Sequence, residues 1–169
     1  MNIYAATVPQ LAKVLNNLDN WIASAIAFAD KKKFSPDNLV TARLAPDQYA
    51  FARQVQTACD NAKFVAARLA GKDAPAHPDT ETTLDQLRAR IATVLAYLAT
   101  FKADDFAGAD DRKISLPFQE GKWMTGAEYA IEFALPNFYF HVVNAYEILR
   151  HNGVELGKRD FIGSIPMRA

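Results

Sequence analysis

The segment PNFYFHVVNAYEILRHNG, residues 136–153, constrains the fold more than any other part of the sequence. It predicts a helix that is apolar nearly all round. At about 100° per residue, one face combines apolar side chains with Asn137, His141 and Asn144. The opposite arc is wholly apolar and carries Leu135, Tyr139, Val142, Val143, Tyr146 and Leu149. Such a helix must be covered on both sides, either at the centre of a bundle or between a bundle and a partner.

Two further amphipathic helices are predicted upstream by apolar residues with the period of a helix. The first begins at the capping box of residues 7–10, has a proline in its first turn, and ends near Lys33. The second runs from about Asp47 to Leu69, and Gly71 closes it. Each of them has an apolar stripe long enough to cover a neighbouring helix.

A third helix is predicted after an exposed loop that contains two prolines. Thr83 and Gln86 form the capping box at its start, and its apolar stripe continues to Phe101. Arg88 and Arg90 fall away from that stripe, so we expect both to point into solvent.

A short β-hairpin should precede the last helix. Apolar and polar residues alternate between Lys113 and Met124, and a Gln-Glu-Gly turn divides the two halves. The capping box that begins at Thr125 then opens the fourth helix, which ends at Gly153. Pro136 lies within this helix, where it should remove one hydrogen bond and bend the axis.

These elements predict an all-α protein, a four-helix bundle with a short β-hairpin before the last helix, in one domain over residues 1–169. The 19 basic and 19 acidic residues cancel, which argues against a nucleic-acid partner. A single cysteine excludes an internal disulfide, and no leader or membrane span is recognisable. We therefore expect a cytoplasmic protein that binds no membrane.

The end of the last helix resembles the DinB/YfiT-like superfamily of helical bundles. Members typically carry His-x-x-x-His-x-x-Gln in this helix, followed by an Arg and a Gly that match Arg150 and Gly153. That alignment places His141 at the second histidine, Asn144 at the glutamine and Asn137 at the first histidine. Together with RQVQTACDNAKFVAARLAG in the second helix, the segment is similar to a bacterial branch catalogued as a domain of unknown function.

The resemblance implies a divalent metal held by three histidines, one from the second helix and two from the last. In this sequence only His141 matches such a ligand, because His77 lies in a loop and the second helix contains no histidine. His151 lies about 15 Å further along the helix axis, too far to share an ion with His141. We expect no cofactor and no stoichiometric transition metal, since amides are poor ligands for such ions.

The candidate site is a polar pocket between the second and fourth helices. His141 is the candidate catalytic residue, as an acid/base or a lone metal ligand. The candidate binding residues around it are Asn137 and Asn144 from the last helix and Gln54, Gln56 and Asp60 from the second. The structural alternative is a buried histidine satisfied by amide partners.

Two functions remain open. One is a protein of the DinB type that acts on or binds a small molecule in a pocket around His141, where the metal site has degenerated. The other is a non-catalytic bundle retained as a dimeric binding or structural module. A homodimer is expected in both cases, with Tyr139, Val143 and Tyr146 at the contact, unless the hairpin and the tail cover that arc.

Overall fold

The computed structural model describes residues 2–168, and over these residues the chain is all-α. Its long helices are α1 (Ile3–Lys32), α2 (Phe51–Ala70), α3 (Leu84–Leu98) and α5 (Leu135–His151). The short ones are η1 (Pro36–Leu39), η2 (Ala103–Phe106), α4 (Gly126–Glu128), the π-helix η3 (Tyr129–Ala134) and α6 (Lys158–Ile162). The expected predominance of helix is confirmed.

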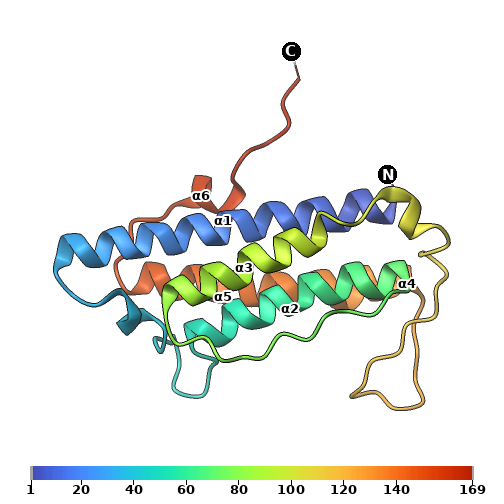
Figure 1. Ribbon diagram of the computed structural model, residues 1–169, viewed down its shortest axis with the longest axis horizontal. Helices are drawn as coiled ribbons and strands as arrows, with labels where there is room; N and C mark the ends of the chain where they lie inside the picture. Colours follow the sequence, from blue (N-terminus) through green and yellow to red (C-terminus); the bar gives the residue numbers. More distant parts are fainter. Residues whose placement is uncertain (1, 169) are drawn as a thin grey trace.

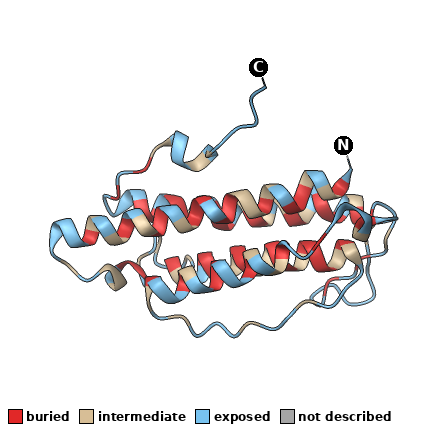
Figure 2. Cartoon of the chain, turned by 45° about the horizontal axis from the view of Figure 1, so that its top comes forward, coloured by how far each residue is buried: buried red, intermediate tan, exposed pale blue. Residues whose placement is uncertain are grey.

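The four long helices lie side by side (Figure 1). α2 packs against both α3 and α5, and α1 packs against all three. The buried residues form stripes on the facing sides of these helices, while the outward sides are exposed (Figure 2). Colours along the chain in Figure 1 show that α2 and α3 run in the same direction and that α1 and α5 run in the opposite one. The connection between α2 and α3 must therefore return along the length of the molecule.

The first helix begins earlier than the capping box at residues 7–10 predicts. Asn2 is the N-cap, and its side-chain oxygen accepts a hydrogen bond from the amide of Ala5. Thr7 is buried inside the helix, and its hydroxyl donates to the carbonyl oxygen of Ile3 at 2.7 Å. The prediction was wrong because the short segment before Thr7 has apolar contacts of its own, including the ring contact of Tyr4 with Phe106.

Some of the predicted ends of α2 and α3 agree with the structure and others do not. α2 starts at Phe51 rather than Asp47, so residues 47–50 remain in the preceding connection. Its predicted C-terminal stop is confirmed, because Gly71 has φ +67°, a conformation that L side chains rarely adopt. The capping box of Thr83 and Gln86 is present with both of its hydrogen bonds, although α3 ends at Leu98, before Phe101.

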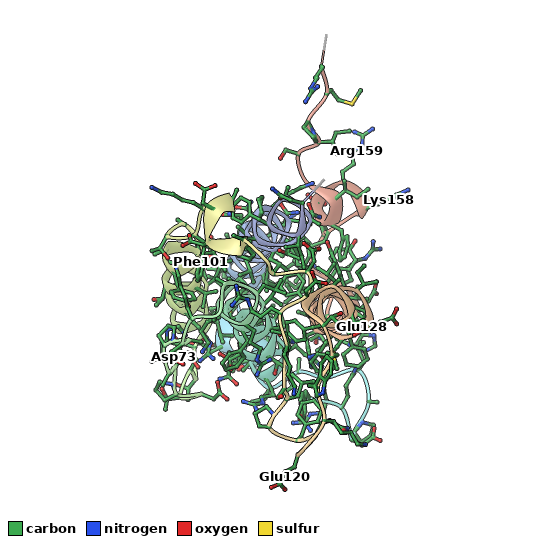
Figure 3. All side chains as sticks on the ribbon, turned by 90° about the vertical axis from the view of Figure 1, so that its right-hand side faces the viewer. Asp73, Phe101, Glu120, Glu128, Lys158 and Arg159 are labelled. Atoms are coloured by element: carbon green, nitrogen blue, oxygen red, sulfur yellow. The ribbon has the colours of Figure 1, made fainter. Side chains whose placement is uncertain are left out.

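The segment predicted as a β-hairpin contains one antiparallel bridge, between Ile114 and Met124. Backbone hydrogen bonds of 2.8 and 3.0 Å join these two residues, and the chain between them forms turns. Glu120 lies at the far tip of this excursion, beyond the helices (Figure 3). The proline in the first half of the segment lacks the amide that a longer ladder requires.

Pro136 is accommodated by a change of helix type. The capping box at Thr125 opens α4 as predicted, and the next six residues form the π-helix η3, in which Leu135 donates to the carbonyl oxygen of Ala130. A proline ring clashes with the carbonyl four residues earlier in an α-helix, and the wider π turn moves that carbonyl away. After η3 the chain continues as α5 to His151.

The tail after α5 packs against α1. Trp21 donates its indole hydrogen to the carbonyl oxygen of Asp160 at 3.0 Å, and its ring stacks on Phe161. Phe161 also meets the ring of Tyr146 edge-on, so the tail covers part of the apolar arc of α5. Among residues 2–168 we find no helix with the length and apolar character that a bilayer span requires.

Candidate functional site

Polar side chains face one another along the contact between α2 and α5, here called the α2–α5 seam. Three side chains of α5 each meet one partner from α2 or the connection before it. Asn137 donates to Asn61 at 2.8 Å, the Nδ1 of His141 lies 2.7 Å from the Oε1 of Gln54, and Asn144 accepts from Gln48. Because the two helices are antiparallel, the residue numbers of the partners decrease as those of the α5 residues increase.

The contact with Gln54 fixes the tautomer of His141. Gln54 is fully buried, and its Nε2 donates to the backbone carbonyl of Tyr49 at 3.2 Å. Its Oε1 must therefore face the imidazole, and an amide oxygen can only accept. Nδ1 of His141 carries the proton, and Nε2 keeps a free lone pair, since no group of the described chain donates to it.

Two exposed aromatic rings flank the imidazole. The Tyr49 ring lies nearly parallel to it, with centroids 6.2 Å apart and an interplanar angle of 13°. The Phe140 ring stands almost perpendicular to it at 5.2 Å. Tyr49 and Phe140 are 52% and 58% exposed, whereas His141 is 6% exposed. The imidazole thus lies just below the surface, between two rings that face solvent.

This environment keeps His141 neutral. Burial is the main cause and the positive charge of Arg53 the second, and together they lower its pKa from 6.5 to about 4. At neutral pH the side chain is therefore a hydrogen-bond donor to Gln54 and an acceptor at Nε2. It carries no charge that would attract an anionic ligand.

Asn137 and Asn144 lie one turn to either side of His141, as the sequence predicts, but both form their hydrogen bonds with other groups. The Nδ2 of Asn144 donates to the carbonyl oxygen of Phe140 at 2.8 Å, within its own helix. Two buried atoms of their partners have no hydrogen-bond partner, Nδ2 of Asn61 and Oε1 of Gln48. The seam is thus a row of amide contacts with spare hydrogen-bonding capacity at both ends.

Gln56 and Asp60 point away from His141 and join a second polar cluster between α2 and α3. Gln56 donates to Glu81 at 2.9 Å, and Asp60 binds Arg90 at 2.9 Å and Lys63 at 2.8 Å. Of the three α2 candidates only Gln54 lies at the imidazole. The expectation that Arg90 points into solvent is wrong, because its side chain is 2% exposed.

A divalent metal does not fit the residues around His141. Among residues 2–168 no three His, Cys, Asp or Glu side chains come together in a way that could hold a metal ion. The neighbours of His141 are neutral amides, and the two positions beside it on α5 are asparagines already bonded to other amides. Zinc, nickel and iron select imidazole, thiolate or carboxylate sets, so the donor chemistry is wrong for them.

Three residues of the seam were not predicted from the sequence: Gln48, Tyr49 and Asn61. The predicted second helix, from about Asp47, includes Gln48 and Tyr49, and only the later start of α2 allows these residues to fold over α5. Asn61 lies on α2 next to Asp60 and about two turns beyond Gln54. Its pairing with Asn137 depends on the axial offset of the two helices, which periodicity alone does not give.

The chain matches the family described as "Domain of unknown function (DUF1993)" over residues 3–162. It is also similar to a protein of known crystal structure from Shewanella denitrificans, described as a DinB family member. The two share 53% sequence identity and a TM-score of 0.95, over 99% of this chain and 95% of that one. No curated protein matches the sequence.

Proposed function

The chain belongs to the DUF1993 family and is a DinB-like protein. From this premise we propose that the surroundings of His141 serve as a neutral recognition site for a small molecule. In this proposal the four long helices form a DinB-type four-helix bundle in one domain, with His141 as the central ligand-contacting residue. The observation that carries the proposal is the hydrogen bond between His141 and Gln54. It uses Nδ1 of His141 as a donor and leaves Nε2 as a free acceptor.

The rings of Tyr49 and Phe140 define the class of ligand. Both are exposed apolar rings beside the imidazole, and such rings suit contact with an aromatic or heteroaromatic ligand. A ligand N–H or O–H would donate to Nε2 of His141. The ligand should be uncharged, because His141 is neutral and the nearby Arg53 is already paired with Asp79.

Binding is favoured over catalysis at this site. A general base works best when its pKa is near the operating pH, and the pKa of His141 is about 4. The imidazole is oriented by an amide rather than a carboxylate, so no charged partner stabilises an imidazolium. Recognition by hydrogen bonding and stacking needs neither property.

The proposal is tested by NMR on protein labelled with 15N in its histidine side chains. The spectrum should show His141 as the Nδ1-protonated tautomer, still neutral at about pH 5.5, well above its pKa of about 4. Indole, a flat neutral N–H donor, should shift the Nε2 resonance of His141. Untagged protein should contain less than one equivalent of zinc, nickel or iron.

His151 is the matched control, because it is an exposed histidine on the same helix. Indole should leave its resonances unchanged, and His151→Ala should bind indole like the wild type, whereas His141→Ala should not. If indole shifted neither imidazole, the recognition site would be disproved. One equivalent of metal that is lost in His141→Ala would replace the proposal with a metal centre.

A dimeric binding or structural module is the second candidate, favoured by the exposed apolar side chains on the outer face of α5. Phe140 and Val143 are 58% and 43% exposed there. Of the predicted contact residues, Val143 is available for a partner, while Tyr146 is buried under Phe161 and Trp21. Tyr139 is half-buried and its hydroxyl accepts from Gln10 at 3.0 Å, so it is also engaged within the chain.

Sedimentation equilibrium tests this candidate at tens of micromolar, on the order of the dissociation constant of an ordinary interface. We expect a dimer, and Val143→Glu should shift it to monomer by placing a charge in the contact. Glu147→Gln, on the same exposed side of α5, is the control that should leave the mass unchanged. A wild type that is monomeric throughout would exclude the module.

A further inference from the structure

The connection between α2 and α3 is an extended strap, residues 72–82, that runs back along the molecule (Figure 1). None of its side chains is buried. Residues 73–81 form no backbone–backbone hydrogen bond. Asp73 lies near the start of the strap, at the outer edge of the molecule (Figure 3). Hydrophobic burial and backbone pairing therefore do not hold the strap in place.

Its acidic end is held by cations of α2 and α3. Arg90 binds Asp79 at 3.0 Å and Glu81 at 3.1 Å, and it also donates to the carbonyl oxygen of Pro78 at 3.1 Å. Asp79 forms a second ion pair with Arg53. Asp79 and Glu81 thus share a guanidinium that lies beneath the strap.

The helices alone are strongly cationic at this place. They contribute Arg53, Lys63 and Arg90 but only one carboxylate, Asp60, so the strap carboxylates bring the cluster to neutrality. The side chains of Lys63 and Arg90 are each 2% exposed. Cations buried to that degree require anionic partners, and here a segment without backbone pairing supplies two of them.

A pocket of about 320 Å³ opens beside the cluster. Its lining includes His77, Glu81, Arg90, Ala89 and Thr93. The Nε of Arg90 is buried and has no hydrogen-bond partner, so the guanidinium is not fully used by the strap. Burial alone would lower the pKa of Arg90, but the hydrogen bond with Glu81 and the charge of Asp60 outweigh it and raise the pKa above its usual value. The guanidinium therefore stays charged.

We propose that the cation cluster of Arg53, Lys63 and Arg90 is a binding site for a small dicarboxylate, and that Asp79 and Glu81 of the strap occupy it as an intramolecular ligand. Two carboxylates separated by one residue already pair with Arg53 and Arg90 there. An external dicarboxylate presents the same groups, enters from the pocket beside Glu81 and displaces the strap. The site is centred on Arg90 and Asp60, which lie away from the contact between Gln54 and His141. Arg53 lies near both sites, because it pairs with Asp79 and its positive charge also acts on His141.

Calorimetric titration with glutarate tests the site. Asp79→Asn with Glu81→Gln removes the competing carboxylates, so the double variant should bind glutarate about tenfold more tightly than the wild type, as expected when an intramolecular competitor is lost. Adding Arg90→Gln should abolish that gain. Sodium chloride at matched ionic strength in every titration excludes a general salt effect. A folded double variant that binds no better than the wild type would overturn the proposal, as would a triple variant that binds equally well.

A second measurement on the otherwise native chain covers the case in which the double variant does not fold. A spin label at Ala76→Cys reports on the strap, since Ala76 is exposed and the native Cys59 is fully buried, which raises its thiol pKa to about 12 and keeps it unreactive. Glutarate should increase the mobile fraction of the label beyond the effect of sodium chloride at equal ionic strength. An unchanged spectrum with saturating glutarate would mean that the strap is a fixed structural tie and that no dicarboxylate displaces it.

Discussion

Helix α2 has a buried polar cluster on each of two sides, and the two clusters are built from different chemistry. Toward α5 the contacts are between neutral groups, of which His141 with Gln54 is the most buried. Toward α3 the contacts are ion pairs centred on Arg90. The neutral side joins two helices, whereas the charged side also fastens a strap whose residues 73–81 form no backbone–backbone hydrogen bond.

The difference shows how one helix can hold a neighbouring helix stably and a second segment in a way that can be reversed. A neutral hydrogen bond costs little to bury and contributes modestly, so the seam with α5 can rest on apolar packing around it. A buried ion cluster is costly to desolvate and depends on every partner being present. Removing one member should therefore have a larger effect on the charged side. The following predictions test that order.

Arg90→Leu should have the largest effect. It leaves Asp60, Asp79 and Glu81 without their common partner, and breaking a buried ion pair costs about 3–5 kcal/mol. Chemical denaturation measures this loss. Arg88→Leu is the control on the same helix: its pair with Asp19 is more exposed and should cost less than about 1 kcal/mol. Equal losses in the two variants would contradict the comparison.

Acidification should weaken the neutral side through His141. Its folded-state pKa of about 4 lies below the ordinary value of 6.5, so between these values the unfolded chain binds a proton that the folded chain does not. Stability is fully present above about pH 6.5 and falls as the pH falls toward about 4, by on the order of 2 kcal/mol.

The unfolding free energies of the wild type and His141→Gln at about pH 7 and pH 4.5 isolate this contribution, because other groups titrate equally in both. The wild type should lose more stability than the variant. Parallel losses would mean that His141 is not the group responsible.

Gln54→Leu should cost about 1–2 kcal/mol, because it leaves the Nδ1–H of His141 buried without an acceptor. Gln10→Leu removes a part-exposed amide contact with Tyr139 and should cost about 0.5 kcal/mol or less. A double-mutant cycle of Gln54→Leu with His141→Leu should show coupling. If the two losses were additive, the contact would make no energetic contribution.

Asn144→Ala should have the smallest effect, about 0.5 kcal/mol or less, since Asn144 lies at the part-exposed rim of the seam. Thermal unfolding measures it against Gln54→Leu. A loss as large as that of Gln54→Leu would show that the seam is equally stabilised along its length.

The all-α fold could be predicted because each long helix has a regular apolar stripe and most have local end signals. Gly71 and the capping boxes at Thr83 and Thr125 act within four residues, so the sequence displays them directly. The predicted start of α1 was wrong because the apolar contacts of Ile3 and Tyr4, which extend the helix, lie outside the capping pattern.

The site could be predicted in part. His141 and its two asparagine neighbours follow from helical spacing, and Gln54 was among the α2 candidates. Spacing on one helix does not reveal which residue of a second helix faces it, so Gln56 and Asp60 were grouped with His141 although they face α3. Arg90 was misplaced for a related reason: the strap that buries it comes from a loop without periodicity.

The π-helix η3 gives α5 freedom to absorb changes in chain length. A π turn contains one residue more than the α-helical turn it replaces. The extra residue upstream of Pro136 therefore widens one turn locally and does not rotate the rest of the helix about its axis. Removing one residue from η3 would return it toward an α-helix, and residues 137–151 would keep their orientation toward α2. Length variation among related sequences should therefore be tolerated at this point, upstream of His141, and excluded from the stretch between Asn137 and Asn144.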